Sequence, residues 1–275
     1  MASELVRRLR LVVDGLPVRL WATGEPADQA AGRPWLLAVH GAGGGARHWL
    51  PLLRLLARER LLALAPDLPG HGGSAARTGE VSIPAYAAWL GRLLDALAAS
   101  WPGLGRPWLA GHSMGGAIAQ EAALAFPERL AGLVLVATGA RLRVAPAFLE
   151  QMEAGSLPPL LRAPSGEGPG GAEGPGRAEE ADPEEVALPV ALADFLACDR
   201  FDRREAVGAI RLPTLVIHGE ADPLTPPRYG EFLASRIPGA RLERVPGAGH
   251  FVLLEAPEAC AEAILAALRP SPGAS

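Results

Sequence analysis

Short apolar runs alternate with longer amphipathic stretches along the chain. The runs with strand character cover residues 9–13, 18–22, 35–39, 61–65, 108–110, 133–136, 214–217 and 241–245. They are short and often bounded by Gly or Pro, as is typical of buried strands. Apolar residues at helical spacing fill the intervals at 48–58, 84–100, 114–126, 227–236 and 258–268. This alternation predicts an α/β fold whose mainly parallel sheet is covered by helices on both faces.

The first two runs flank Asp14 and Gly15. A two-residue Asp-Gly connection between strands is typical of a tight β-hairpin. We therefore expect the chain to open with an antiparallel pair.

One long insertion interrupts the alternation between two core strands. Residues 163–185 are dense in Gly, Pro and acidic residues and contain no large apolar side chain, which predicts a mobile loop. Apolar positions on either side predict helices that pack against the core: Phe148, Leu149, Met152, Leu192, Phe195 and Leu196. We therefore expect a core domain of residues 1–138 and 210–275, with a small helical cap insertion at 139–209 and a flexible segment at 163–185.

Composition and charge narrow the function classes. The chain has 275 residues, of which 49% are hydrophobic, which is enough for a sizeable core. A formal net charge of −4 argues against a nucleic-acid partner, because phosphate binding needs clustered positive charge. Neither a signal peptide nor a run of about 18 apolar residues is recognisable, so we expect a cytoplasmic protein without a membrane span.

Cysteine, lysine and asparagine usage adds little about chemistry. Cys198 and Cys260 are predicted to be buried free thiols, and no Cys/His spacing indicates zinc, so no metal or cofactor is expected. The chain has neither Asn nor Lys. Absence of Asn suits a heat-adapted protein, absence of Lys argues against it, and GC-rich coding explains both. The absence of Asn therefore favours a thermophilic source, with GC-rich coding as the alternative.

The strongest local motif is Gly111-His112-Ser113-Met114-Gly115-Gly116. It follows a strand pattern and precedes a helix pattern, which is the context of a nucleophile elbow. A sharp turn there holds the serine in a strained conformation, and glycines two residues away avoid collision. The motif predicts that Ser113 is a nucleophile at the carboxyl edge of the sheet.

A serine nucleophile needs a base and a carboxylate that orients it. His250 lies in a Gly-rich loop between the last strand and the last helix, where the mechanism requires a base. The other five histidines are expected to be structural. Asp222 follows a β-branched strand and is the predicted acid, with Glu220 as rival. The alternative is that Asp222 merely satisfies amides of its own turn.

Two backbone N–H groups are predicted to hold the oxyanion that acyl transfer creates. One belongs to Met114, which follows the nucleophile, and the other to Ala42, in the loop His40-Gly41-Ala42-Gly43-Gly44-Gly45. A phosphate-binding loop is the alternative, but the Gly-Lys-Ser/Thr signature is missing. The residues predicted to border the substrate pocket are Gly41, His112, Phe148, Met152, Phe195 and Phe251. For the side chains among them, packing in the core is an equal alternative.

Together these motifs, with Asp67-Leu68-Pro69-Gly70-His71-Gly72-Gly73-Ser74 and the chain order Ser, Asp, His, resemble the α/β-hydrolase superfamily. The resemblance implies an eight-stranded, mostly parallel sheet with an antiparallel second strand and a cap over the site. It is nearest in character to small carboxylesterases, enol-lactonases and monoacylglycerol lipases. The Gly/Pro/acidic interruption of the cap departs from that pattern.

The leading hypothesis is hydrolysis of esters, thioesters or lactones of small to medium acyl groups through an acyl-enzyme. Acyl transfer, carbon–carbon bond hydrolysis and cofactor-free perhydrolysis are alternatives on the same triad. A non-catalytic small-molecule receptor is a further alternative, which the apparently complete triad disfavours. The sequence leaves the natural substrate and the oligomeric state open.

Overall fold

The structure is a computed structural model that describes residues 5–29, 32–76, 79, 81–158 and 186–269. The predicted mobile segment 163–185 lies outside the described residues. Eight strands form one sheet: β1 (Arg7–Val13), β2 (Leu16–Ala22), β3 (Leu36–Val39), β4 (Ala63–Pro66), β5 (Trp108–His112), β6 (Gly132–Val136), β7 (Thr214–Gly219) and β8 (Arg241–Val245). Every predicted strand is present, with ends shifted by at most two residues.

The strand order is β1-β2-β4-β3-β5-β6-β7-β8. Only β2 runs antiparallel to its neighbours β1 and β4, and the remaining pairs are parallel. This confirms the α/β-hydrolase fold class that the sequence predicts. From β3 the chain continues to β4 on one side of β3, and from β5 it continues to β6 on the opposite side of the sheet. The direction of strand addition therefore reverses between the adjacent strands β3 and β5. Such a switch point leaves a crevice at the carboxyl ends of the strands, where ligands bind.

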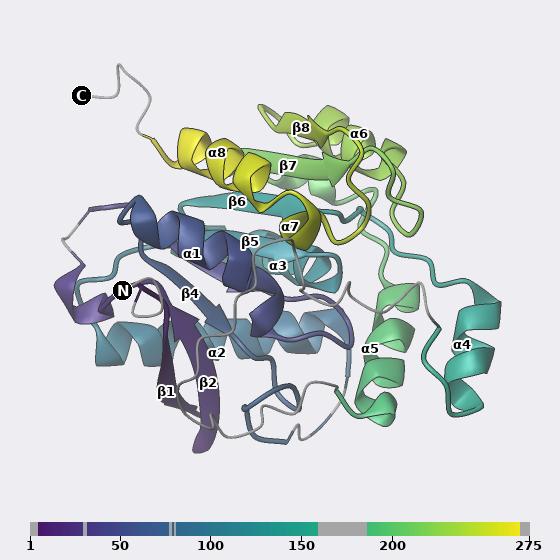
Figure 1. The fold of residues 1–275 in the computed structure, drawn as a ribbon, viewed down its shortest axis with the longest axis horizontal. Helices are drawn as coiled ribbons and strands as arrows, with labels where there is room; N and C mark the ends of the chain where they lie inside the picture. Colours follow the sequence, from purple (N-terminus) through teal and green to yellow (C-terminus); the bar gives the residue numbers. More distant parts are fainter. Residues whose placement is uncertain (1–4, 30–31, 77–78, 80, 159–185, 270–275) are drawn as a thin grey trace, which may run out of the picture.

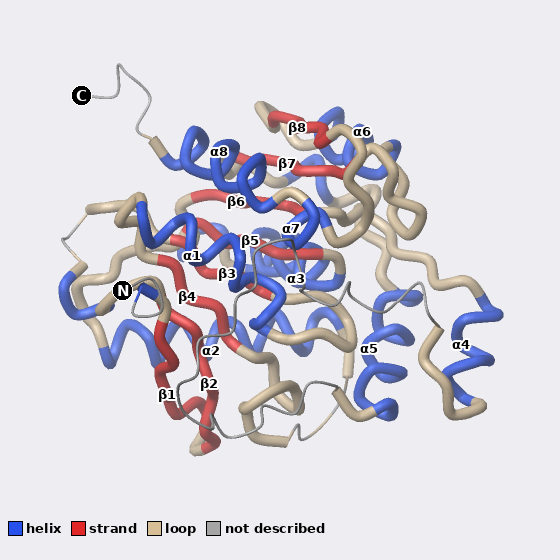
Figure 2. Tube along the Cα trace, viewed as in Figure 1, coloured by secondary structure: helices blue, strands red, loops and turns tan. Residues whose placement is uncertain are grey.

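Helices cover both faces of the sheet (Figures 1 and 2). One face carries α2 (Ile83–Ser100), α3 (Met114–Ala125) and α6 (Arg228–Arg236), and the other carries α1 (Leu50–Arg58), α7 (Val252–Glu255) and α8 (Pro257–Leu268). Each layer encloses its own apolar cluster, with β3 and β6 buried at every position. Cys198 and Cys260 are buried free thiols, as predicted.

Local chemistry explains where the helices differ from the prediction. The first predicted helix begins as a 3-10 turn (Ala46–Trp49) and becomes α1 at Leu50. Pro51 lies in the first turn of α1, where its missing N–H costs no hydrogen bond. Helix α7 was not predicted, because four residues are too few to show helical periodicity. Short 3-10 turns also occur at Pro26–Asp28, Pro127–Arg129 and Val207–Ala209.

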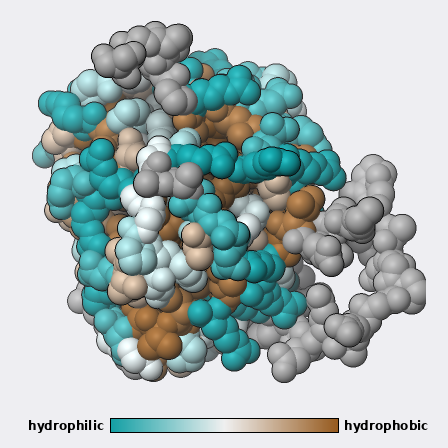
Figure 3. Space-filling model, turned by 90° about the vertical axis from the view of Figure 1, so that its left-hand side faces the viewer, coloured by the Kyte–Doolittle hydropathy of each residue, from teal (hydrophilic) through white to brown (hydrophobic). Residues whose placement is uncertain are grey.

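The β1–β2 hairpin closes one edge of the sheet. Asp14 and Gly15 have φ values of 54° and 78°, as a type I′ turn requires, and Val13 pairs with Leu16. Figure 3 views this side of the molecule, where apolar surface is interrupted by hydrophilic residues. Val12 is 61% exposed on the outer strand, so the sheet edge is partly apolar but broken by arginines.

The insertion contributes two helices beside the carboxyl edge of the sheet, α4 (Pro146–Glu153) and α5 (Leu188–Arg200), which pack on each other (Figure 1). The Asp199 carboxylate accepts a hydrogen bond from the Val144 N–H at 3.2 Å and so links α5 to the segment before α4. Among the described residues, none of the helices has the length and apolar character that crossing a bilayer requires.

Candidate active site

Ser113 occupies the sharp turn between β5 and α3. Its backbone angles, φ 53° and ψ −115°, lie in a region that residues other than glycine rarely adopt. The turn is held on both sides, since the Ser113 N–H donates to the Val136 carbonyl at 2.9 Å and the Thr138 hydroxyl donates to the Ser113 carbonyl at 2.8 Å. The predicted strand–turn–helix context of the serine is therefore present.

Three glycines make this turn sterically possible. A Cβ atom on Gly111 would lie 2.1 Å from the Gly115 carbonyl oxygen, and one on Gly115 would lie 2.2 Å from the Val39 carbonyl oxygen. At Gly116 the side chain of Thr138 would be 2.5 Å away. The first turn of α3 thus passes directly against β3 and β5, and a methyl group has no room there.

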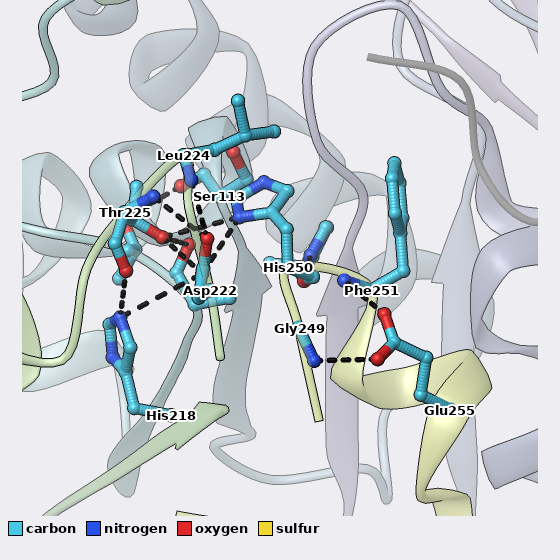
Figure 4. Close-up of polar contacts among 12 residues, drawn as sticks. Ser113, His218, Asp222, Leu224, Thr225, Gly249, His250, Phe251 and Glu255 are labelled. Carbon is cyan, nitrogen blue, oxygen red and sulfur yellow. Dashed lines mark hydrogen bonds and ion pairs between the residues drawn. The ribbon is translucent and has the colours of Figure 1, made fainter. Parts of the chain in front are cut away.

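His250 and Asp222 form a buried pair at the ends of β8 and β7 (Figure 4). His250 Nδ1 lies 2.9 Å from Asp222 Oδ2. The other oxygen, Oδ1, accepts hydrogen bonds from the N–H groups of Leu224 (2.8 Å) and Thr225 (2.9 Å). One oxygen of Asp222 thus orders its own turn, and the other faces the imidazole. Glu220, the rival carboxylate, is exposed to solvent.

Hydrogen bonds determine the charge of Asp222. Burial favours the neutral acid, but the bonds from His250 and Thr225 outweigh burial and hold the pKa of Asp222 below its ordinary value. Asp222 is therefore an ionised acceptor that fixes the proton of His250 on Nδ1.

Thr225 is a member of the site that the sequence interpretation missed. Its hydroxyl oxygen lies 2.7 Å from Asp222 Oδ2, 2.9 Å from the Ala137 carbonyl and 3.2 Å from His250 Nδ1. Its carbonyl accepts a hydrogen bond from His218 Nε2 at 2.6 Å. The signal that could have found it is the spacing Asp-x-x-Thr, which brings the N–H and hydroxyl of Thr225 to the Asp222 carboxylate.

Hydrogen bonds with Glu255 and His112 fix the backbone of the loop that carries His250. The Glu255 carboxylate accepts hydrogen bonds from the N–H groups of Gly249 (2.5 Å) and Phe251 (3.1 Å), the two neighbours of His250. His112 Nε2 donates to the His250 carbonyl at 2.9 Å. Burial and the nearby His250 lower the pKa of His112 to about 3, so His112 is a neutral donor at pH 7. The ring of Phe251 lies against His48, His112 and His250.

Ser113 and His250 line one cavity of about 630 Å³. Among the described residues no hydrogen bond joins the two side chains, and in ligand-free enzymes such bonds are often long and tighten on substrate binding. The cavity lining is mainly apolar, and its members are Ser113, Leu142, Arg143, Val144, Ala145, Pro146, Phe148, Leu149, Phe195, Cys198, Asp199, Pro223, Leu224, Thr225 and His250. Burial raises the pKa of Cys198 well above its ordinary value, so its sulfur is an inert thiol.

The predicted pocket residues fall into two groups. Phe148 and Phe195, from α4 and α5, line the cavity. Gly41, His112, Met152 and Phe251 do not belong to its lining; Met152 is buried with 1% exposure. For Met152 the sequence identified the apolar face of α4 but not which of its side chains turn toward the cavity, because neighbouring positions differ only in angle around the helix axis.

The loop after β3 forms a tight turn from Gly41 to Gly44. The Gly44 N–H donates to the Gly41 carbonyl at 3.2 Å, and Gly43 has φ +61°, which a type II turn requires at its third position. A Cβ atom on Gly41 would lie 3.2 Å from Ser113 Cβ, so this loop borders the serine. Among the described residues, the N–H groups of Ala42 and Met114 have no hydrogen-bond acceptor. Both predicted oxyanion donors are thus available to a ligand.

Three other histidines lie outside the Ser113–His250–Asp222 group. His40 Nε2 accepts from the Leu68 N–H at 3.0 Å and Nδ1 donates to the Gly41 carbonyl at 2.9 Å. Burial, followed by repulsion from His71, lowers the pKa of His40 to about 3. His71 Nε2 lies 2.7 Å from Asp194 Oδ2. Burial lowers the pKa of His48 to about 4. The described residues contain no group of three or more His, Cys, Asp or Glu arranged to hold a metal ion.

Comparison with known proteins agrees with this geometry. Residues 36–263 match the Alpha/beta hydrolase family, and the chain belongs to that family. It is 31% identical to a pimeloyl-[acyl-carrier protein] methyl ester esterase of Aromatoleum aromaticum, over 83% of this chain and 96% of that protein. A solved thermophilic esterase superposes with a TM-score of 0.72 at 30% identity, covering 95% of this chain and 96% of that one.

A third relative is much longer than this chain. Polyketide synthase ThaQ of Burkholderia thailandensis is 36% identical over 86% of this chain, but the match spans only 12% of that protein. Taken together, the comparisons place the chain among α/β-hydrolases related to esterases.

The contact of α3 with β3 generates a stability prediction. In the interior of an exposed helix, replacing a glycine by alanine stabilises a protein by about 1 kcal/mol. Here the new methyl group would meet the Val39 carbonyl oxygen, so we expect the free energy of unfolding to fall by about 3 kcal/mol. Urea unfolding of Gly115→Ala measures it, with Gly103→Ala as the matched control because its nearest contact would be an ordinary 3.7 Å. A Gly115→Ala protein as stable as the parent contradicts the described packing.

The buried neutral histidines generate a pH prediction. His40 and His112 have folded-state pKa values of about 3, whereas unfolded histidine titrates near 6.5. Below pH 6.5 the unfolded state therefore binds more protons, and stability falls as the pH falls toward 3. From pH 7 to pH 5 we expect a loss of roughly 2 kcal/mol per histidine in the free energy of unfolding.

Urea titrations at pH 7, 6 and 5 check this expectation. Asp222 and Asp194 have lowered pKa values, and carboxylates stay ionised in both states across this window, so they do not contribute to the slope. The pKa values of His48, about 4, and of His218 are lowered as well, so His112→Gln removes one of four such rings. It is expected to reduce the slope by about a quarter. Stability that does not change between pH 7 and pH 5 would show that these rings are not held neutral.

Proposed function

We propose that the chain is a serine hydrolase that cleaves carboxylic esters of small to medium acyl groups through an acyl-enzyme. The observation that carries this proposal is the buried His250–Asp222 pair, 2.9 Å apart, whose His250 lines the same cavity as Ser113, a serine held at φ 53°. Membership of the Alpha/beta hydrolase family and the esterases among its relatives support it.

In the proposed reaction the Ser113 hydroxyl attacks the ester carbonyl carbon while His250 Nε2 takes its proton. The Asp222 carboxylate stabilises the imidazolium that results. The carbonyl oxygen becomes an oxyanion that accepts hydrogen bonds from the N–H groups of Ala42 and Met114, and the N-terminus of α3 adds a favourable dipole. His250 then protonates the leaving alcohol, and water activated by the same imidazole releases the acid from Ser113.

The shape of the cavity supports the substrate class. A volume of about 630 Å³ falls in the range of sites that enclose one small ligand. Phe148, Leu149 and Phe195 present apolar surface from α4 and α5 to the acyl group. We propose that residues 139–209, which contribute these helices, form the cap over the site, and that residues 1–138 and 210–275 form the catalytic core.

A turnover panel tests the proposal. Substrates are p-nitrophenyl esters from acetate to palmitate together with simple lactones, and we expect short and medium acyl chains to be cleaved with higher kcat/KM than palmitate. Ser113→Ala is expected to lower kcat by at least about a thousandfold, because no other group supplies the nucleophile. Ser235→Ala, an exposed serine on α6, is the matched control and should retain parental kinetics.

Two outcomes count against the proposal. Full activity in Ser113→Ala rules out Ser113 as the nucleophile. Absence of turnover in the parent, combined with failure of a fluorophosphonate to label Ser113, favours a receptor over an enzyme. Product analysis in water with added methanol separates hydrolysis from acyl transfer on the same acyl-enzyme.

A further inference from the structure

A fully buried carboxylate on insertion helix α5 has no place in the reaction proposed above. Asp194 has 0% exposure, although a buried charge is costly unless it is paired and hydrogen-bonded. Its Oδ2 lies 2.7 Å from His71 Nε2 and accepts the Gly43 N–H at 3.1 Å, and its Oδ1 accepts the Tyr86 hydroxyl at 2.7 Å. These partners come from the loop after β4, the loop after β3 and helix α2. One insertion side chain therefore joins three parts of the core.

The charge state of the cluster follows from these bonds. Burial favours the neutral acid, but hydrogen bonds from His71, Tyr86 and Gly43 outweigh burial and lower the pKa of Asp194. His71 in turn lies 3.1 Å from the Pro69 carbonyl through Nδ1, so both of its ring nitrogens face oxygen acceptors. The carboxylate is thus held by hydrogen bonds from three donors at a fully buried position next to the Gly41–Gly44 turn.

Gly43 is the residue that connects this cluster to catalysis. It is the third residue of the Gly41–Gly44 turn, whose second residue is Ala42, the proposed oxyanion donor. A Cβ atom on Gly43 would lie 3.1 Å from Ala191 Cβ and 3.7 Å from Phe195 Cε2. Residues 191, 194 and 195 share one face of α5, so this helix face contacts the turn through packing and through the Asp194–Gly43 hydrogen bond.

The core side of the same turn has its own support. His40 Nδ1 donates to the Gly41 carbonyl, and the rings of His40 and His71 have centroids 4.9 Å apart. His40, from the core, therefore fixes the Gly41 carbonyl, and Asp194, from the insertion, fixes the Gly43 N–H. Fixing both ends sets the direction in which the Ala42 N–H points.

We propose that Asp194 is a positioning residue that couples the insertion to the oxyanion hole: when α5 is seated on the core, its carboxylate orients the Gly41–Gly44 turn so that the Ala42 N–H meets the oxyanion. The inference rests on the proposed serine-hydrolase function. It assigns to the insertion a part in transition-state stabilisation in addition to its part in lining the cavity.

The test compares Asp194→Asn with the parent on a short p-nitrophenyl ester, with kcat expressed per active site titrated by a fluorophosphonate. We expect kcat to fall about tenfold or more and KM to stay within twofold, because the oxyanion exists only after attack. A trifluoromethyl ketone, whose adduct with Ser113 places an oxyanion in the same hole, should show a Ki raised by a similar factor. Asp202→Asn, an exposed charge beyond α5, is the control and should match the parent.

A purely structural Asp194 predicts a different pattern. In that case Asp194→Asn lowers the unfolding temperature, but kcat per titrated site and Ki stay within twofold of the parent, and the proposal is overturned. If Asp194→Asn does not fold, Tyr86→Phe decides, because it removes one donor to the carboxylate and keeps the ring. It should lower kcat and raise Ki about threefold, and unchanged values overturn the proposal.

Failure of this inference is distinguishable from failure of the proposed function. An inactive Ser113→Ala together with a parent-like Asp194→Asn removes the coupling and leaves the hydrolase assignment in place. An active Ser113→Ala removes both.

Discussion

The site depends on how closely helix α3 approaches strands β3 and β5. At Gly115 the helix backbone passes so near the Val39 carbonyl that a methyl group would lie 2.2 Å from its oxygen. This contact forces the chain to reverse direction within one residue after β5, and that residue is Ser113. The strained angles of the serine follow from packing of the sheet against the helix. The hydroxyl is therefore held at the sheet edge by the core of the fold.

The sheet topology brings the remaining groups to the same edge. The loops after β3, β5, β7 and β8 carry Ala42, Ser113, Asp222 and His250 in turn, and the carboxyl ends of parallel neighbours open on one side. Each group is then fixed by local hydrogen bonds: Asp222 by its own turn amides, and His250 by Glu255 and His112. Precise placement thus comes from short-range bonds built on a long-range arrangement.

Local motifs carried most of what could be predicted. A few consecutive residues are enough to predict each of these features: the turn at Ser113, the Asp-Gly hairpin, and the loops that contain Asp222 and His250. Hydrophobic pattern and turn chemistry suffice because each feature is local in the sequence. Apolar runs likewise predicted all eight strands. β3, β4 and β6 are apolar because both of their faces are buried, whereas β1, β2 and β8 have exposed positions.

Contacts between distant segments could not be predicted in this way. Asp194 is one acidic residue in an amphipathic helix, and nothing near it in the sequence indicates that it meets His71, 123 residues earlier. Glu255 precedes the last predicted helix and looks like an ordinary surface residue, yet it accepts hydrogen bonds from two loop amides. Phe251 was expected in the pocket and instead packs on three histidine rings, since the loop geometry determines which way its side chain turns.

The most direct test of the account is a crystal structure of the protein after reaction with a methyl-substituted fluorophosphonate. The account predicts phosphorus bonded to Ser113 Oγ, with the phosphoryl oxygen within hydrogen-bond distance of both the Ala42 and the Met114 N–H groups, and with His250 Nε2 facing the remaining oxygen. An adduct on another residue, or a phosphoryl oxygen directed into solvent away from these two amides, would contradict it.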